Sequence, residues 1–159
     1  FVARVSRILL QTGARAQKLR LEITEGVMMQ EPLKVVNQMH ELCALGLSFS
    51  VDDFGTGYSS LSYIQKLPLA ELKIDKSFVN DMTGNLRSEA IVKAIIALGH
   101  SLGSVIVSEG VETEAQRQRL LELGCTLIQG YLVARPMTRL ALEEHIDDGQ
   151  WTSANPPGL

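Results

Sequence analysis

Short stretches rich in strand-forming residues alternate along the chain with longer stretches in which apolar residues recur every three or four positions. The first pattern predicts strands at 18–23, 48–52, 71–74, 104–109 and 126–130. The second predicts helices over 33–43 and 91–102, and a further helix over 117–123 follows the capping pair Thr113 and Gln116. A strand-helix-strand order of this kind favours a parallel α/β fold.

Each predicted strand has a polar or charged side chain at its C-terminal end. Side chains alternate between the two faces of a strand, so Glu22 lies opposite the apolar Leu21 and Ile23. The other strand ends contribute Asp52 with Asp53, Lys73 with Asp75, Glu109 and Gln129. In parallel sheets and barrels the ligand site lies at this end of the strands. Five such ends together predict a functional site better than they fit five unrelated turns.

The acidic residues among these strand ends indicate metal chemistry. Carboxylates that are brought together repel one another, and hard divalent cations neutralise them. Oxygen ligands without thiolates or histidines favour Mg²⁺ or Mn²⁺ over zinc. Two such ions can activate water and stabilise the charge that develops on phosphate oxygens during hydrolysis. Lys73 would add a cationic donor to water or phosphate.

Composition narrows the class of protein and partner. The chain has 159 residues, 45% of them hydrophobic, and a net charge of -3, which fits a soluble globular domain. A mildly acidic chain does not favour a nucleic acid polymer, so a nucleotide partner is expected to be small. No apolar run approaches the roughly 18 residues of a membrane segment, and the N-terminus does not resemble a signal peptide. We expect a cytoplasmic domain, whose parent protein could still be membrane-anchored elsewhere.

Five motifs in order resemble those of the EAL family, the bacterial phosphodiesterases that act on cyclic di-GMP. They are L-E-I-T-E (21–25), D-D-F-G-T-G-Y-S-S-L (52–61), L-K-I-D (72–75), S-E-G-V-E-T (108–113) and Q-G-Y-L-V-A-R-P (129–136). The resemblance covers nearly the whole chain. It implies a TIM-barrel-like (β/α) fold and a site with two Mg²⁺ or Mn²⁺ ions that cuts cyclic di-GMP to linear pGpG.

The resemblance also implies a role for individual residues. Metal ligands would be Glu22, Asp52, Asp53 and Glu109, and the catalytic residues Glu109, as ligand or general base, and Lys73. Asp75, Glu112 and Gln129 would bind substrate or support the site. Glu25 would anchor the D-F-G-T-G loop, whose order couples metal binding to a homodimer interface.

Two motifs of the family have no counterpart here. The Glu-Ala-Leu that names the family and the strand with a metal-binding asparagine are both absent, and a TIM barrel usually needs about 250 residues. We therefore expect residues 1–150 to be the C-terminal portion of an EAL domain with about five barrel strands, and 151–159 to be a disordered tail. The upstream part of the domain, with sensor or GGDEF domains, would complete the parent protein.

Three classes of function remain open. A metal-dependent phosphodiesterase is favoured because every family catalytic position within this stretch keeps its residue type. A non-hydrolytic cyclic di-GMP receptor would be expected where acidic ligands had been lost, and a dimerising regulatory module is suggested by the D-F-G-T-G-Y loop. The isolated chain is expected to be inactive, since two ligands would lie upstream.

Overall fold

A single parallel sheet forms the centre of the protein. The computed structural model describes residues 1–57 and 61–147. Its strands are β1 (Arg20–Thr24), β2 (Ser48–Phe54), β3 (Glu71–Ile74), β4 (Val105–Ser108) and β5 (Leu127–Ile128). All four neighbouring pairs are parallel, and the strand order follows the chain. The predicted α/β fold with five parallel strands is confirmed.

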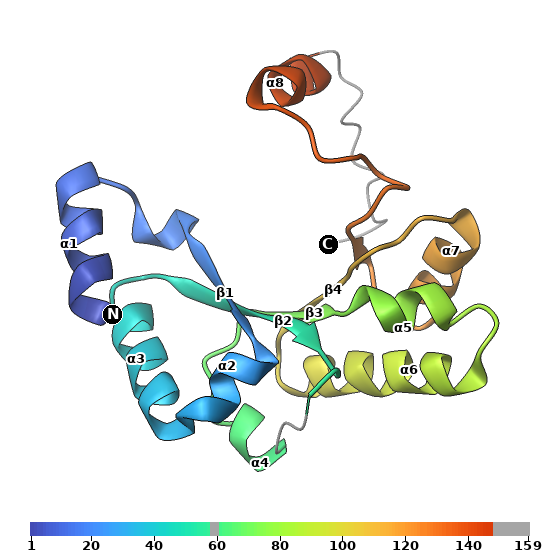
Figure 1. Ribbon diagram of the computed structural model, residues 1–159, viewed down its shortest axis with the longest axis horizontal. Coiled ribbons are helices and arrows are strands. Elements are labelled where there is room, and N and C mark those ends of the chain that lie inside the picture. Colours follow the sequence, from blue (N-terminus) through green and yellow to red (C-terminus); the bar gives the residue numbers. More distant parts are fainter. Residues whose placement is uncertain (58–60, 148–159) are drawn as a thin grey trace.

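Helices connect the strands and cover one face of the sheet. They are α1 (Val2–Thr12), α2 (Glu25–Gln30), α3 (Pro32–Ala44), α4 (Leu61–Ile64), α5 (Lys76–Asp81), α6 (Leu86–Ser101), α7 (Glu114–Glu122) and α8 (Arg139–Asp147). Figure 1 shows α3 and α6 on the same side of the strands, whereas α8 stands apart from the sheet at the end of an extended segment. The face opposite α3 and α6 is the one that carries the polar strand side chains.

The hydrophobic core lies between the sheet and its helices. From the strands, Val51, Leu72 and Ile74 are completely buried. The same core includes Met39 and Leu42 of α3, Val92, Ile95 and Ile96 of α6, and Leu120 of α7. Burying each such side chain contributes about 1.5–3 kcal/mol. The alternation seen in the sequence therefore places the apolar set toward the helices and leaves the polar set on the other face.

The ends of the helices agree with the local signals. Gly46, Gly103 and Gly124 follow α3, α6 and α7 with φ of 98°, 69° and 91°, which are left-handed values that favour glycine. At the start of α7, Thr113 and Gln116 form the expected capping box. The short turns that these residues produce return the chain to the next parallel strand.

Several predicted boundaries need correction. The first strand begins at Arg20 rather than at residue 18, because Ala16–Lys18 form a 3₁₀ turn. The second strand continues past Asp52 to Phe54, whose side chain enters the core. The last strand is limited to Leu127–Ile128, because its ladder with β4 covers just two residue pairs. The fourth strand is shorter than predicted by one residue at each end.

Two sequence predictions fall on parts of the chain that the structure does not describe. The predicted tail at 151–159 lies outside the described residues, and so do positions 58–60 of the D-F-G-T-G-Y-S-S motif. None of the helices within the described ranges combines the length and apolarity that a bilayer crossing requires.

Glu25, the first residue of α2, links this helix to the loop that follows β2. The residue is 3% exposed, and Oε2 accepts hydrogen bonds from the backbone N–H groups of Gly55 and Gly57, each at 3.1 Å. A side chain at Gly57 would collide with this carboxylate, since an added Cβ would lie 2.9 Å from Cδ of Glu25. The contact therefore requires both the buried acid and a bare backbone.

We predict that Glu25→Ala accelerates amide hydrogen exchange at Gly55 and Gly57, because the substitution removes the acceptor of both N–H groups. The expected acceleration is about tenfold, which corresponds to roughly 1.4 kcal/mol of lost protection. Glu25→Gln, which keeps an oxygen acceptor of the same size, serves as the control and should change exchange less. Equal exchange rates in the parent and in Glu25→Ala would show that the carboxylate does not order this segment.

Candidate active site

Lys73 lies at the centre of a group of carboxylates that come from the C-terminal ends of neighbouring strands. Its Nζ is 2.6 Å from Oε1 of Glu109, 3.0 Å from Oε1 of Glu22 and 3.4 Å from Oδ1 of Asp52. Glu22 belongs to β1, Asp52 to β2 and Lys73 to β3, and Glu109 directly follows β4. Four residues that are far apart in sequence thus meet as the strand alternation predicts.

Burial and charge act in opposite directions on Lys73. The side chain is 7% exposed, and this burial would lower the pKa of the ammonium. Hydrogen bonds to Glu109 and Glu22, with the charges of Glu109 and Asp52, outweigh burial and raise the pKa above its ordinary value. Lys73 is therefore a positively charged hydrogen-bond donor. It balances one of three carboxylates, so the group keeps an excess of acidic oxygen atoms.

A distortion in β2 explains how the carboxylates of two adjacent aspartates lie close together. The register between β2 and β3 shifts between Val51 and Phe54, and Asp53 has a left-handed φ of 53°. Asp tolerates this conformation better than most residues do. The backbone N–H of Asp53 donates to Oδ1 of Asp52 at 3.1 Å. Strict alternation would have sent the two side chains to opposite faces.

The distortion produces a compact set of oxygen ligands. One carboxylate oxygen from each of Asp52, Asp53 and Glu109 lies within 4.8 Å of the other two. Oxygen donors without nitrogen or sulfur suit a hard divalent cation such as Mg²⁺ or Mn²⁺. The donor set thus fits the class of metal that the sequence predicts, and Glu22 reaches the same group through its contact with Lys73.

Asp53 and Asp75 form a second, coupled pair of acids. Partial burial, followed by the charges of Asp52 and Asp75, raises the pKa of Asp53. Burial alone would also raise the pKa of Asp75, but hydrogen bonds from the side chain and backbone of Ser77 outweigh it, so the pKa of Asp75 is lowered. Asp75 caps the N-terminus of α5, which fixes its position beside Asp53.

The remaining predicted residues lie around the cluster rather than in it. Gln129 follows β5, where its N–H donates to the carbonyl oxygen of Ser108 at 2.8 Å and its own carbonyl oxygen accepts from Val111. The side chains of Gln129 and Glu112 are exposed. Across 1–57 and 61–147, no hydrogen bond or ion pair joins either side chain to the carboxylates around Lys73. Glu25 contacts the loop after β2.

Sequence reasoning did not identify a second polar layer on the same face of the sheet. Arg20 forms an ion pair with Glu71, and Oγ of Ser50 donates to Oε1 of Glu71 at 3.0 Å. These residues precede Glu22, Asp52 and Lys73 by two positions on the same three strands. Strand alternation could have found them, since it assigns Arg20 and Glu22 to one face. Ser77 was also missed, although Asp-x-Ser at a helix start is a capping signal.

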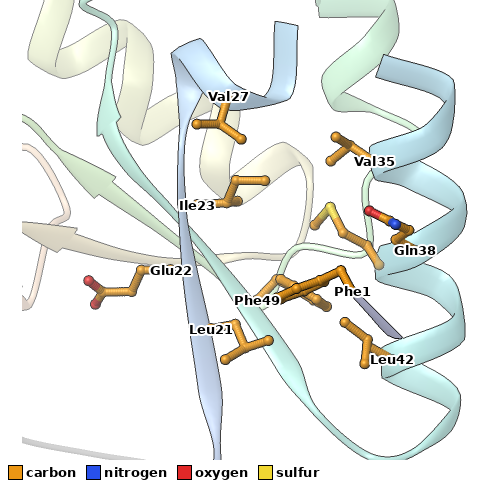
Figure 2. Close-up of a pocket in the computed structure, with 10 residues that line it drawn as sticks. Phe1, Leu21, Glu22, Ile23, Val27, Val35, Gln38, Leu42 and Phe49 are labelled. Carbon is orange, nitrogen blue, oxygen red and sulfur yellow. The ribbon is translucent and has the colours of Figure 1, made fainter. Parts of the chain in front are cut away.

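A cavity on the opposite face of β1 is separate from the polar cluster. Its volume is about 340 Å³, and apolar side chains from β1, β2 and α3 form most of its lining. Figure 2 shows Leu21 and Ile23 directed toward the cavity, whereas Glu22 extends to the other side of the strand. The alternation along β1 thus separates an apolar face toward the helices from the acidic face that holds Lys73.

Relatives of known name match this chain over most of its length. The bifunctional diguanylate cyclase/cyclic di-GMP phosphodiesterase MucR of Pseudomonas aeruginosa is 47% identical over 133 residues, which are 84% of this chain and 19% of MucR. The cyclic di-GMP phosphodiesterase NbdA of the same organism is 43% identical over 98% of the chain and 20% of its own length. The chain thus spans about a fifth of the length of these relatives.

Solved structures have the same arrangement of strands and helices. A structure described as the MucR phosphodiesterase in complex with c-di-GMP superposes with a TM-score of 0.85 at 45% identity, over 89% of this chain and 57% of that one. A manganese/cy-diGMP complex of Klebsiella pneumoniae BlrP1 superposes with a TM-score of 0.77 at 31% identity, over 85% of this chain and 34% of the BlrP1 chain. The sequence profile described as "EAL domain" matches residues 1–136. This chain belongs to the EAL domain family.

Proposed function

We propose that this chain contributes to a divalent-metal-dependent phosphodiesterase site that hydrolyses cyclic di-GMP to linear pGpG. The observation that carries the proposal is the arrangement of Glu22, Asp52 and Glu109 around Lys73 at the ends of adjacent strands. The names of MucR and NbdA support the same reaction, and the MucR structure contains c-di-GMP. Membership of the EAL family links the geometry to this substrate.

The oxygen atoms of Asp52, Asp53 and Glu109 would hold the metal, with Glu22 as a further ligand. The manganese in the BlrP1 complex supports a divalent cation, and we propose Mg²⁺ or Mn²⁺ in two sites. When bound, such ions supply a water molecule of lowered pKa and positive charge beside the phosphate oxygens. Further ligands would come from sequence outside this chain.

The residues of the chain would then position substrate and water. Lys73 donates hydrogen bonds from a buried ammonium and would orient the phosphate or the attacking water. Glu109, at 2.6 Å from that ammonium, would act as a metal ligand or as the general base that takes a proton from water. Asp75 would hold Asp53, and the exposed side chains of Glu112 and Gln129 are available to substrate.

We predict that Asp52→Asn lowers kcat for cyclic di-GMP by about 100-fold or more while the fold is kept, because the amide is isosteric but binds a cation weakly. The measurement is pGpG formation by the full protein that contains this sequence, in Mg²⁺ or Mn²⁺. Asp81→Asn, the same change at an exposed position of α5, is the matched control.

If Asp52→Asn turned over cyclic di-GMP at the parental rate, Asp52 would not be a ligand of the proposed metal site. Binding of cyclic di-GMP without turnover by the parent protein would instead support a receptor.

We also propose that the 159-residue chain does not turn over cyclic di-GMP alone. It spans 57% of the MucR structure, and two-metal catalysis depends on ligands held in fixed positions. We predict that pGpG forms with the full protein and falls at least about 100-fold with the purified chain at equal Mn²⁺. Comparable rates would show that the residues described above form a sufficient site.

A further inference from the structure

A second layer of polar residues lies next to the Lys73 group on the same face of the sheet. Arg20 of β1 forms an ion pair with Glu71 of β3, and Ser50 of β2, which lies opposite Glu22 and Glu71 in the strand register, donates to Glu71 at 3.0 Å. Nε of Arg20 also donates to Oγ of Ser48 at 3.4 Å. We call Arg20, Ser50 and Glu71 the inner polar layer.

Glu71 is a potential competitor for the ammonium of Lys73. Residues two apart on a strand share a face and are about 6.6 Å apart, which is within reach of a lysine side chain. The side chain of Glu71 is 11% exposed, so its carboxylate needs a partner within the protein. Arg20 and Ser50 fill this need, and Lys73 extends instead toward Glu22, Asp52 and Glu109.

We propose that Arg20 is a positioning residue: by binding Glu71, it keeps Lys73 directed at the carboxylates of the active site. This inference rests on the proposed phosphodiesterase function and extends it to a residue that, within 1–57 and 61–147, forms no hydrogen bond or ion pair with Lys73 or its three carboxylates. Without Arg20, a buried carboxylate would lie next to Lys73 along β3. The ammonium would then divide between Glu71 and the active-site acids.

The two members of the ion pair differ in exposure, so replacing one is expected to have a different effect from replacing the other. The side chain of Arg20 is 43% exposed, so water can solvate it when Glu71 is replaced. The carboxylate of Glu71 is largely buried, so water cannot solvate it in the same way when Arg20 is replaced. Arg20→Gln is therefore expected to harm catalysis, Glu71→Gln to be tolerated, and the double variant to recover. If the ion pair served stability alone, Arg20→Gln would lower the unfolding temperature but leave kcat of the folded protein unchanged.

The test is a double-mutant cycle in the full protein, with kcat and KM for cyclic di-GMP and the unfolding temperature measured for each variant. We expect Arg20→Gln to lower kcat at least about tenfold with a smaller change in KM, and the double variant to return to within about threefold of the parent. Arg117→Gln breaks the exposed ion pair with Glu114 on α7 and should leave kcat unchanged. No recovery in the double variant would overturn the proposal.

Crystal structures of the parent and of Arg20→Gln give a second result that does not depend on turnover. We expect Nζ of Lys73 to move into hydrogen-bonding distance of Glu71 in the single variant and to return toward Glu109 in the double variant. A lysine that keeps its contacts with Glu22 and Glu109 in Arg20→Gln would overturn the positioning role. If the parent cleaves no cyclic di-GMP, the proposed function fails, while the movement of Lys73 still tests the inference.

Discussion

The active-site face depends on the pairing of the buried ammonium of Lys73 with three carboxylates. An isolated ammonium is costly to bury, and unpaired carboxylates at such short distances repel one another. The contacts at 2.6, 3.0 and 3.4 Å lower both costs, and they require β1, β2, β3 and the segment after β4 to end at the same edge of the sheet. One cation cannot balance all the acids, so the same arrangement that stabilises the face also leaves an excess of acidic oxygen atoms, which is the basis of the proposed metal site.

The rest of the sheet supports this arrangement from both sides. On one face, Val51, Leu72 and Ile74 pack against the helices and fix the strands that carry Asp52 and Lys73. On the other face, the ion pair of Arg20 with Glu71 occupies the carboxylate two residues before Lys73 on β3. Alternation along each strand therefore separates two faces. The hydrophobic face packs against the helices and holds the strands in place, and the polar face carries the charged side chains.

Much of this could be predicted from the sequence, because period-two alternation and strand ends are local signals. The five parallel strands, the capping box at Thr113 and the meeting of Glu22, Asp52, Lys73 and Glu109 all follow from them. The left-handed Asp53 could not be predicted, since no glycine marks the irregularity in β2. The length of β5 depends on pairing with β4 and not on its own residues. Strand alternation could have placed Arg20 and Glu71 on the face that holds Glu22 and Lys73, but it does not indicate that the two residues pair with each other.

We propose that the strand ends around Lys73 bind the divalent cations used to cleave cyclic di-GMP. Anomalous diffraction from crystals of the full protein soaked in Mn²⁺ tests it most directly, since manganese is located without reference to activity. We expect anomalous peaks within about 2.0–2.6 Å of carboxylate oxygens of Asp52, Asp53 or Glu109, which is the range of oxygen ligands to hard cations. Manganese bound elsewhere, with none at these three residues, would contradict it.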